Sequence, residues 1–477
     1  SGTSSKSSKL IHGGLRYLQQ GEIGLVYEAL HERQRLRKNA PHLVQLLPFM
    51  IPILTKDGVV SKKIARALGS ALWMYDLTGG WRVGKFHRRL RAKTAHTHMP
   101  TMNSDRLAAA YLYFDAEADD ARLTLAIVQS AVARGAVALN YCGVSALHKN
   151  SAGVLTGASV RTHEGDTFDI SARVVVNATG VWVDALRQMD GEAIGRPVKP
   201  IVAPSQGVHI VVDREFLPSD HALMVPKTAD GRVLFAVPWL GKLILGTTDS
   251  PRQDIVREPQ PFREEVRFIL DESARYLTRA PKVEDIRSIW VGLRPLVKPQ
   301  DDDGDNTKKI SREHTVLASR SGLITVTGGK WTTYRAMAED VLQKCFTTGL
   351  LPEKPSGVTN HLPLVGTPEG AVQHRISDAQ GLHSYGSEAA VVRDIAGAHT
   401  DLGGGLTEAM VRFAARYEYA CTVEDVLARR SRLLFLDARK AIELAPAVAD
   451  ILRAELGADP HLDAFLELAQ QYLQVPA

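Results

Sequence analysis

The residues best suited to binding a charged ligand lie in the first stretch of the chain, residues 1–19, SGTSSKSSKLIHGGLRYLQ. Serine hydroxyls and unhindered backbone N–H groups are what a chain offers to phosphate oxygens or to the polar edge of a planar cofactor. The Gly13–Gly14 step permits a turn or a close approach to a ligand, and Arg16 presents a planar fork of donors suited to phosphate or carboxylate. The composition alone favours the alternative, a disordered serine-rich tail ahead of a helix.

A second stretch of this kind is LITVTGGKWTTYR, residues 323–335. The pattern predicts a strand, a Gly-Gly turn and a helix that begins near Thr332. The N–H groups at a helix start have no partner within the helix and lie at its positive end, so such a turn can hold a negative charge. Lys330 adds a full positive charge. The alternative is an ordinary strand–helix connection with a threonine cap.

A buried strand is predicted ahead of a third polar turn, in ARVVVNATG, residues 172–180. Three consecutive valines indicate a strand that is buried on both faces, as in a parallel sheet. Thr179 and Gly180 then lie at its carboxyl end, the edge at which α/β sheets bind cofactors.

Between residues 199 and 299 the pattern changes to alternating strands, which predicts an antiparallel sheet. The expected strands and helix are residues 207–212, 233–237, 243–247 and 288–294, with a helix that carries Val266, Ile269, Leu270 and Leu277 on one face. His209 lies in the middle of the first strand and Arg294 at the end of the last. A structural histidine and a surface arginine are the ordinary alternatives.

The elements around these stretches are mostly helical. We expect helices at residues 22–39 and 117–136, a strand at 137–139, a hairpin from 154–162 to 167–170, and C-terminal helices at 408–419, 423–436 and 438–456. Asp119 and Asp120 are read as acidic residues favoured at a helix start. The acidic run 301–305 is read as a solvated turn, because no liganding Glu follows at the spacing of a calcium loop.

One region combines apolar and basic residues. LLPFMIPIL (46–54) and residues 64–75 are apolar, and a basic cluster follows, formed by Arg82, Lys85, His87, Arg88, Arg89, Arg91 and Lys93. Apolar surface beside cations is typical of a peripheral membrane contact. A buried helical subdomain with a solvated basic face is the alternative.

The composition sets the outer limits. The 477 residues are 44% hydrophobic and carry a net charge of +5, too weak to indicate a nucleic-acid partner. Three widely spaced cysteines form no metal or redox motif and indicate a reducing compartment. No apolar run is long enough to cross a bilayer.

Taken together, SSKLIHGGLRYL, the NATG turn and ITVTGGKWTTYR resemble the FAD-dependent, aerobic-type glycerol-3-phosphate dehydrogenases. The resemblance implies an α/β and α+β flavoprotein fold, with an antiparallel substrate-binding sheet and a C-terminal helical domain in which TVEDVLARRSRLLFLDAR (422–439) matches a family motif. The expected boundaries are 1–198 with 315–350 for the FAD-binding domain, which includes the membrane-contact region 46–93, then 199–314 for the substrate-binding domain and 358–477 for the helical domain.

The resemblance also assigns site residues. For FAD these are Ser4, Ser5, Ser8, Lys9, Leu10, His12, Gly13, Gly14, Thr179, Gly180, Gly328, Gly329, Lys330, Trp331 and Thr332. For glycerol 3-phosphate they are Arg16, Tyr17, Arg294, Arg312 and Lys330. Arg294 and His209 are the expected catalytic pair, with His209 as the base, although a water polarised by arginine could serve instead.

The resembling family has a G-x-G-x-x-G unit just upstream of its flavin loop, and no such fingerprint occurs in this sequence. Since the chain also starts without Met, we expect a flavoprotein fold that lacks its first βαβ unit, in an N-terminally truncated chain whose own FAD binding and activity are in question. No metal is expected.

The resemblance implies electron transfer to a membrane quinone, and a cytoplasmic enzyme held peripherally on the inner membrane, with a homodimer left open. The alternatives are a glycerol-3-phosphate oxidase that uses oxygen, and an inactive flavoprotein remnant.

Overall fold

The structure, a computed structural model, describes residues 2–18, 21–54, 62–79, 84–192, 198–226, 228, 233–298, 313–355 and 357–476. Its central feature is a ten-stranded mixed sheet. The strands of this sheet are β1 (Leu10–Ile11), β2 (Val44–Leu54), β3 (Arg88–Arg91), β4 (Leu107–Ala118), β9 (Val202–Asp213), β10 (Ala222–Val225), β11 (Leu234–Trp239), β12 (Lys242–Gly246), β13 (Ser250–Pro251) and β14 (Ser288–Val297).

The order in this sheet is β1-β4-β2-β10-β11-β12-β9-β13, with β14 paired to β9 and β3 paired to β4. The pair of β2 with β10 is parallel. The predicted antiparallel pairing of β11 with β12 is confirmed, as are the predicted strands around His209 and Arg294. The sheet takes strands from both the range expected to bind FAD and the range expected to bind substrate.

Smaller sheets flank the large one. One contains β5 (Cys142–Lys149), β6 (Leu155–Thr162) and β7 (Thr167–Ser171), a second β8 (Val175–Asn177), β15 (His314–Ala318) and β16 (Leu323–Gly328), and a third β17 (Asp401–Gly403) and β18 (Leu406–Thr407). The β6–β7 pair confirms the predicted hairpin, because local alternation and a Gly-containing turn specify its register.

Two strand predictions are wrong in part. β8 runs parallel to β16 as expected, but Val176 is 44% exposed rather than buried on both faces. The reason is that β8 is the edge strand of its sheet. Residues 137–139 form no strand, and Val137 is 87% exposed, because the chain there leads as a loop from α5 to β5.

The helices cover the sheets and fill the C-terminal part of the chain. The α-helices are α1 (Leu15–Leu18), α2 (Ile23–Asn39), α3 (Lys62–Thr78), α4 (Ala92–His98), α5 (Asp120–Val132), α6 (Val183–Glu192), α7 (Arg263–Tyr276), α8 (Tyr334–Thr347), α9 (Ala389–Arg393), α10 (Glu408–Tyr417), α11 (Leu433–Leu436), α12 (Ala438–Leu456) and α13 (Leu462–Gln471). The 3₁₀ helices are η2 (Gly180–Trp182), η3 (Arg214–Phe216), η4 (Val283–Asp285), η6 (Trp331–Thr333), η7 (Thr359–His361) and η8 (Leu382–Glu388), and η9 (Asp425–Arg430) is a π-helix. None of the described helices has the length and apolarity needed to cross a bilayer.

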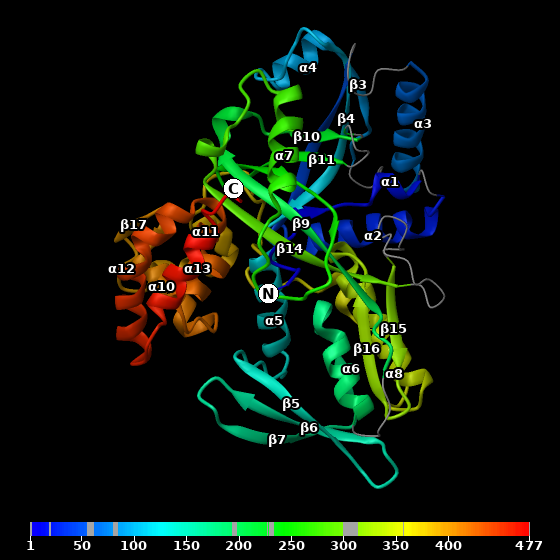
Figure 1. The fold of residues 1–477 in the computed structure, drawn as a ribbon, viewed down its shortest axis with the longest axis vertical. Helices are drawn as coiled ribbons and strands as arrows, with labels where there is room; N and C mark the ends of the chain where they lie inside the picture. Colours follow the sequence, from blue (N-terminus) through cyan, green and yellow to red (C-terminus); the bar gives the residue numbers. More distant parts are fainter. Residues whose placement is uncertain are drawn as a thin grey trace.

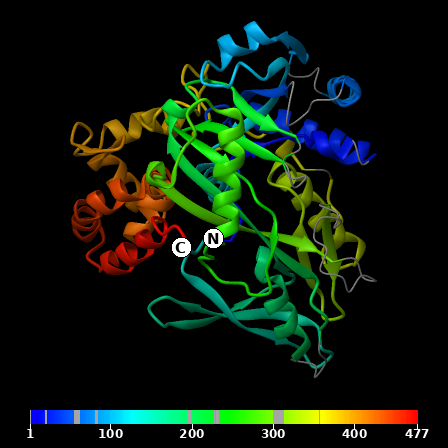
Figure 2. The same ribbon diagram turned by 45° about the horizontal axis from the view of Figure 1, so that its top comes forward.

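Figures 1 and 2 show the C-terminal helices on one side of the large sheet, and the β5–β7 sheet projecting at one end of the molecule. The start of the chain lies near the centre, beside β14 (Figure 1). One cluster of buried apolar side chains runs from the sheet, through Trp239 and Trp290, into the helical domain at Phe435. The helical domain therefore shares a hydrophobic core with the sheet.

Candidate functional site

The first stretch of the chain is ordered and runs between the other predicted turns. At its beginning, the backbone N–H of Leu293 in β14 donates to the carbonyl of Gly2 at 2.9 Å. A Cβ on Gly2 would lie 3.0 Å from the ring of Trp182 in η2, just after the NATG turn. The alternative of a disordered tail does not describe these residues. Three predicted segments meet here, because the loop lies directly between η2 and β14.

The two glycine pairs also meet. The hydroxyl of Thr332 donates to the carbonyl of His12 at 3.3 Å, and a Cβ on Gly14 would lie 3.1 Å from Nζ of Lys330. The ammonium of Lys330 lies 3.8 Å from the ring centroid of Tyr17. Gly14, Gly328 and Gly329 have φ of 83°, 79° and 76°, the left-handed region that favours glycine. The two turns predicted to bind the same ligand therefore face each other.

His209 is buried on β9 and is held by the N-terminal loop. Ser8 Oγ lies 2.8 Å from Nε2 of His209, and the imidazole stacks on Trp290 at a centroid distance of 5.1 Å. Burial, with the positive charges of Arg294 and Lys9, holds the pKa of His209 well below its ordinary value. The ring is therefore neutral at physiological pH and can accept a proton.

Arg294 lies on β14, four residues beyond Trp290, the residue that pairs with His209 on β9. Its guanidinium donates to the carbonyl of Gln206 and to Oγ1 of Thr247, both at 3.1 Å, and lies 3.4 Å from the carboxylate of Asp249. A Cβ on Gly207 would lie 2.3 Å from this guanidinium, so the arginine packs directly on the β9 backbone. β14 continues to Val297, so Arg294 lies within its strand rather than at its end.

The other residues expected to bind FAD line the same loop and turns. The Trp331 indole N–H donates to the carbonyl of Ser4 at 3.1 Å, and Leu10 is a buried core residue of β1. The hydroxyl of Thr179 donates to Asn177 at 2.8 Å. A Cβ on Gly180, whose φ is 64°, would meet no atom within 4 Å, so open space lies beside this turn.

Lys9 differs from the rest of this set. Its ammonium is fully buried and contacts the carboxylate of Asp120 at 2.7 and 3.0 Å and the carbonyl of Ser5 at 2.9 Å. Burial, and then the charge of Arg432, lower the pKa of Lys9 to about 7 against the opposing effect of Asp120. The side chain of Lys9 is thus committed to the protein interior, and its backbone is what remains for a cofactor.

Two of the predicted substrate cations cannot be located. Arg16 lies on α1, but its side chain is outside the described residues, and Arg312 lies outside them altogether. Among the predicted cations, Lys330 faces Gly14 and Tyr17 of the N-terminal segment, and Arg294 follows Leu293, whose backbone pairs with Gly2 and Thr3.

Residues that the sequence reasoning did not identify hold this loop in place. The backbone N–H of Gly13 donates to Tyr75 Oη at 3.0 Å and to Asp115 at 3.2 Å, and Arg33 donates to the same carboxylate at 2.5 Å. Their spacing along the chain carries no motif, so only the fold brings them together.

The donor set fits a flavin. The glycine turns expose backbone N–H groups at the start of η6 and α8, Lys330 supplies a positive charge, and Gly180 faces open space. Such groups stabilise a phosphate or the negative charge of a reduced ring. No group of three or more His, Cys, Asp or Glu that could hold a metal occurs among the described residues.

Comparison with known families gives two matches. Residues 1–335 match the family described as FAD dependent oxidoreductase, and residues 327–462 match the C-terminal domain of alpha-glycerophosphate oxidase.

Known relatives extend the likeness over almost the whole chain. The chain is 38% identical to a probable mitochondrial glycerol-3-phosphate dehydrogenase of Caenorhabditis elegans, over 100% of this chain and 68% of the relative. It is 36% identical to the mitochondrial glycerol-3-phosphate dehydrogenase of Homo sapiens, over 99% and 68%.

Among solved structures, the glycerol-3-phosphate dehydrogenase of Bacillus halodurans complexed with FAD has a TM-score of 0.75 and 25% identity, and the likeness covers 100% of this chain and 88% of that one. The L-alpha-glycerophosphate oxidase of Mycoplasma pneumoniae has a TM-score of 0.55 at 15% identity, covers 76% and 88%, and shows the shared fold alone.

Proposed function

The chain belongs to the FAD-dependent glycerol-3-phosphate dehydrogenases, and from this premise we propose that it oxidises sn-glycerol 3-phosphate to dihydroxyacetone phosphate. The observation that carries the proposal is the N-terminal loop, which meets the second glycine turn and Lys330 at Gly14 and contacts the buried neutral His209 through Ser8. These are the groups that a phosphorylated alcohol and a redox ring require.

The substrate is a dianion near neutral pH, so its phosphate needs cations. Lys330 and Arg294 are two of the positions proposed to bind it, and Arg16 and Arg312 are the others. Arg294 offers a planar fork of donors, and Lys330 offers a compact charge. Tyr17, which lies under the ammonium of Lys330, is proposed to orient that lysine and to donate a hydrogen bond to the substrate.

We propose that FAD lies along the N-terminal loop and the two glycine turns. Ser4, Ser5, Ser8, His12, Gly13 and Gly14 would contact it from the loop, Thr179 and Gly180 from the NATG turn, and Gly328 to Thr332 from the second glycine turn. When bound, FAD supplies the acceptor for the hydride that leaves C2 of the substrate.

His209 is the proposed base. Its lowered pKa keeps the imidazole neutral and able to take the C2 hydroxyl proton. Ser8 fixes the ring through Nε2 and Trp290 fixes its plane, so the proton acceptor is held in one orientation before substrate arrives.

A membrane quinone is the proposed electron acceptor, with peripheral attachment at the region around α3 and β3. The exposed apolar side chains there are Trp73, Met74, Leu77 and Phe86. The exposed cations beside them are Lys85, Arg88, Arg89, Arg91 and Lys93. Apolar groups that enter the headgroup boundary, together with cations that attract anionic lipids, support peripheral binding.

We propose a location on the cytoplasmic side of an inner membrane, in line with this surface. Assembly as a homodimer stays a prediction that only a measurement of mass in solution can decide.

The experiment is direct. The purified protein, reconstituted with FAD, should show a flavin absorbance band and reduce a redox dye only when glycerol 3-phosphate is present. Peroxide formed in proportion to substrate, without dye, would favour the oxidase. A protein with no flavin band and no dye reduction would contradict the proposal.

A further inference from the structure

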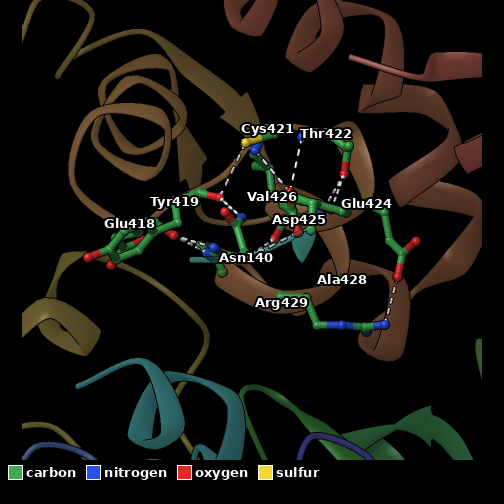
Figure 3. A network of polar contacts seen from close by, with 12 residues as sticks. Asn140, Glu418, Tyr419, Cys421, Thr422, Glu424, Asp425, Val426, Ala428 and Arg429 are labelled. Atoms are coloured by element: carbon green, nitrogen blue, oxygen red, sulfur yellow. Dashed lines mark hydrogen bonds and ion pairs between the residues drawn. The ribbon is translucent and has the colours of Figure 1, made fainter. Parts of the chain in front are cut away.

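The family motif in the helical domain contains a deformed helix. In η9, Ser431 N–H donates to the carbonyl five residues earlier, at Val426, at 2.8 Å. Such widened turns often occur at functional positions. Figure 3 shows how the start of η9 is anchored, because Asp425 accepts from the N–H groups of Cys421 at 2.9 Å and Thr422 at 3.1 Å.

The residue that follows this deformed helix points into the molecule. Arg432 is 0% exposed and has a φ of 60°. Its Nη2 donates to the carbonyl of Ser5 at 2.7 Å and lies 3.3 Å from Asp120, while Nη1 donates to the carbonyl of Ala428 at 2.7 Å. One arginine of the helical domain thus contacts the backbone of the N-terminal loop.

Arg432 and Lys9 share their acceptors. Both cations contact the carbonyl of Ser5 and the carboxylate of Asp120, and Asp120 also accepts from the hydroxyl of Ser7 at 2.8 Å. Residues 7 and 9 are therefore fixed at one buried carboxylate, and residue 5 at the two cations that contact it, which leaves the direction of Ser8 little freedom.

Ser8 and the aromatic rings connect this cluster to His209. Ser8 is the residue between the two fixed positions 7 and 9, and it contacts Nε2 of His209. The ammonium of Lys9 lies 5.3 Å from the ring centroid of Trp290. Trp290 stacks on His209, and its ring centroid also lies 5.2 Å from that of Phe435 in α11.

We propose that Arg432 is a positioning residue for the reaction: through Ser5 and Asp120 it holds residues 5–9 so that Ser8 sets the orientation of His209. The inference rests on the proposed function in one respect, the role of His209 as base. It gives the helical domain a part in the chemistry, through the contacts of Arg432 with Ser5 and Asp120.

The electrostatics of the cluster support this arrangement. The charged groups that face Lys9 are Arg432, Asp119 and Asp120. Loss of Arg432 would leave Lys9 as the one cation of this set beside Asp119 and Asp120, and would change both the charge and the hydrogen bonding that hold the loop. Leaving Asp120 and the Ser5 carbonyl with a single cation would loosen residues 5–9.

The test compares three variants of the FAD-reconstituted protein. Arg432→Met removes the contacts, and Arg432→Lys keeps the charge but not the fork. Arg122→Met is the matched control, because Arg122 is also buried and bridges to the helical domain, where its guanidinium donates to Glu418 at 2.7 Å and to the carbonyl of Arg430 at 3.5 Å, rather than to residues 2–9. Hydrogen exchange of peptides from residues 2–12 is measured with and without FAD, beside kcat and KM for glycerol 3-phosphate.

For Arg432→Met we expect exchange in residues 2–12 to rise by at least about 10-fold, and kcat to fall on the order of 10- to 100-fold, as misplacement of a reacting group does. KM should change less than about 3-fold because the phosphate cations are untouched. For Arg432→Lys, the exchange of residues 2–12 and kcat should both lie between the values of Arg432→Met and those of the parent protein. Arg122→Met should leave residues 2–12 protected.

Unchanged exchange in residues 2–12 would overturn the inference, as would faster exchange with an unchanged kcat. Equal changes in exchange and in kcat for Arg122→Met would also overturn it, since the loss of any buried contact with the helical domain would then have the same effect. If Arg432→Met does not fold, the same comparison is made with Arg432→Lys. The role of His209 as base fails separately, if His209→Asn keeps a normal kcat while the exchange result stands, and the proposed function fails if the parent protein binds no flavin and reduces no dye.

Discussion

At the scale of single residues, the proposed site depends on one buried imidazole whose protonation is controlled by its surroundings. His209 is 3% exposed and lies near Arg294 and Lys9, both positively charged groups that oppose its protonation. An ordinary histidine would be partly protonated at mildly acidic pH. The environment of His209 therefore extends the pH range in which it can act as a base.

Replacing His209 tests its role most directly. His209→Asn keeps a polar side chain of similar reach but cannot take up a proton, so kcat should fall by about 100-fold or more. The measurement is dye reduction at saturating glycerol 3-phosphate, with flavin occupancy determined on the same sample. A kcat near the parent value at full occupancy would assign the proton to another acceptor, such as a water polarised by Arg294.

The pH dependence gives a second prediction for the same group. Because the folded-state pKa of His209 is lowered, kcat should stay level from pH 8 to below the ordinary histidine pKa of about 6.5. The quantity to follow is kcat, since ionisation of the substrate phosphate near pH 6 affects kcat/KM. An acid limb centred at or above about 6.5 would contradict the prediction.

The same shift has a consequence for stability. Below a pH of about 6.5 the unfolded chain binds a proton at this histidine and the folded protein does not, so the free energy of unfolding should fall as the pH drops through this range. In His209→Asn this part of the pH dependence should be absent. Chemical denaturation of both proteins between pH 5 and 8 measures it.

At the scale of elements, the turns around the loop need glycine at defined places. Gly14 has a φ of 83°, and a Cβ there would lie 2.2 Å from the ring of Tyr17. Gly21 has a φ of 80°, but a Cβ there would meet no atom within 4 Å. The two glycines therefore share a backbone conformation and differ in crowding.

This pair separates backbone strain from site geometry. Gly21→Ala should cost about 1–2 kcal/mol of stability from its left-handed conformation alone and leave FAD binding unchanged. Gly14→Ala should cost more than that, and should weaken FAD binding because Tyr17 and Lys330 must move. Denaturant unfolding and flavin titration check both. Equal effects of the two changes on FAD affinity would show that the crowding at Gly14 is irrelevant to the site.

Elements with local signals were predictable from the sequence. The β6–β7 and β11–β12 hairpins and helix α2 follow from periodicity and turn residues within a few positions. The partial exposure of β8 was not predictable, because the valine run specifies a strand but not its place at a sheet edge. Residues 137–139 were likewise predicted as a strand from their composition, and only the surrounding structure shows that they form an exposed loop.

The candidate site was predictable where it is built from motifs. Both glycine turns and His209 could be identified because their residues are contiguous or match a family pattern. Asp120 and Arg432 could not be placed in the site, because they are far apart in the sequence and come together only in the folded chain, where Arg432 lies 3.3 Å from Asp120 and donates to the carbonyl of Ser5. Asp120 was predicted to be a helix-start carboxylate, and it is one. Its second role, as the partner of Lys9 and Arg432, depends on the tertiary structure.

At the scale of the whole molecule, the surface around α3 and β3 leads to a binding prediction. Arg88→Glu with Arg89→Glu should weaken binding to vesicles that contain anionic lipid by about 30-fold or more, since each cation near such a surface contributes about 1 kcal/mol. Vesicle sedimentation at low and high salt measures the effect. Arg412→Glu, on the helical domain, is the control, and unchanged binding of the double variant would exclude this surface.

The large sheet joins the two halves of the site in a way that limits how the protein can move. Strands β2 and β4, which hold the N-terminal loop through β1, belong to the same hydrogen-bonded sheet as β9 and β14, which carry His209 and Arg294. A hinge movement that closed these halves onto each other would have to break hydrogen bonds between the strands of the sheet and the contact of Ser8 with His209. Substrate admission thus falls to side chains and surface loops, and the particle's radius of gyration should be the same with and without glycerol 3-phosphate.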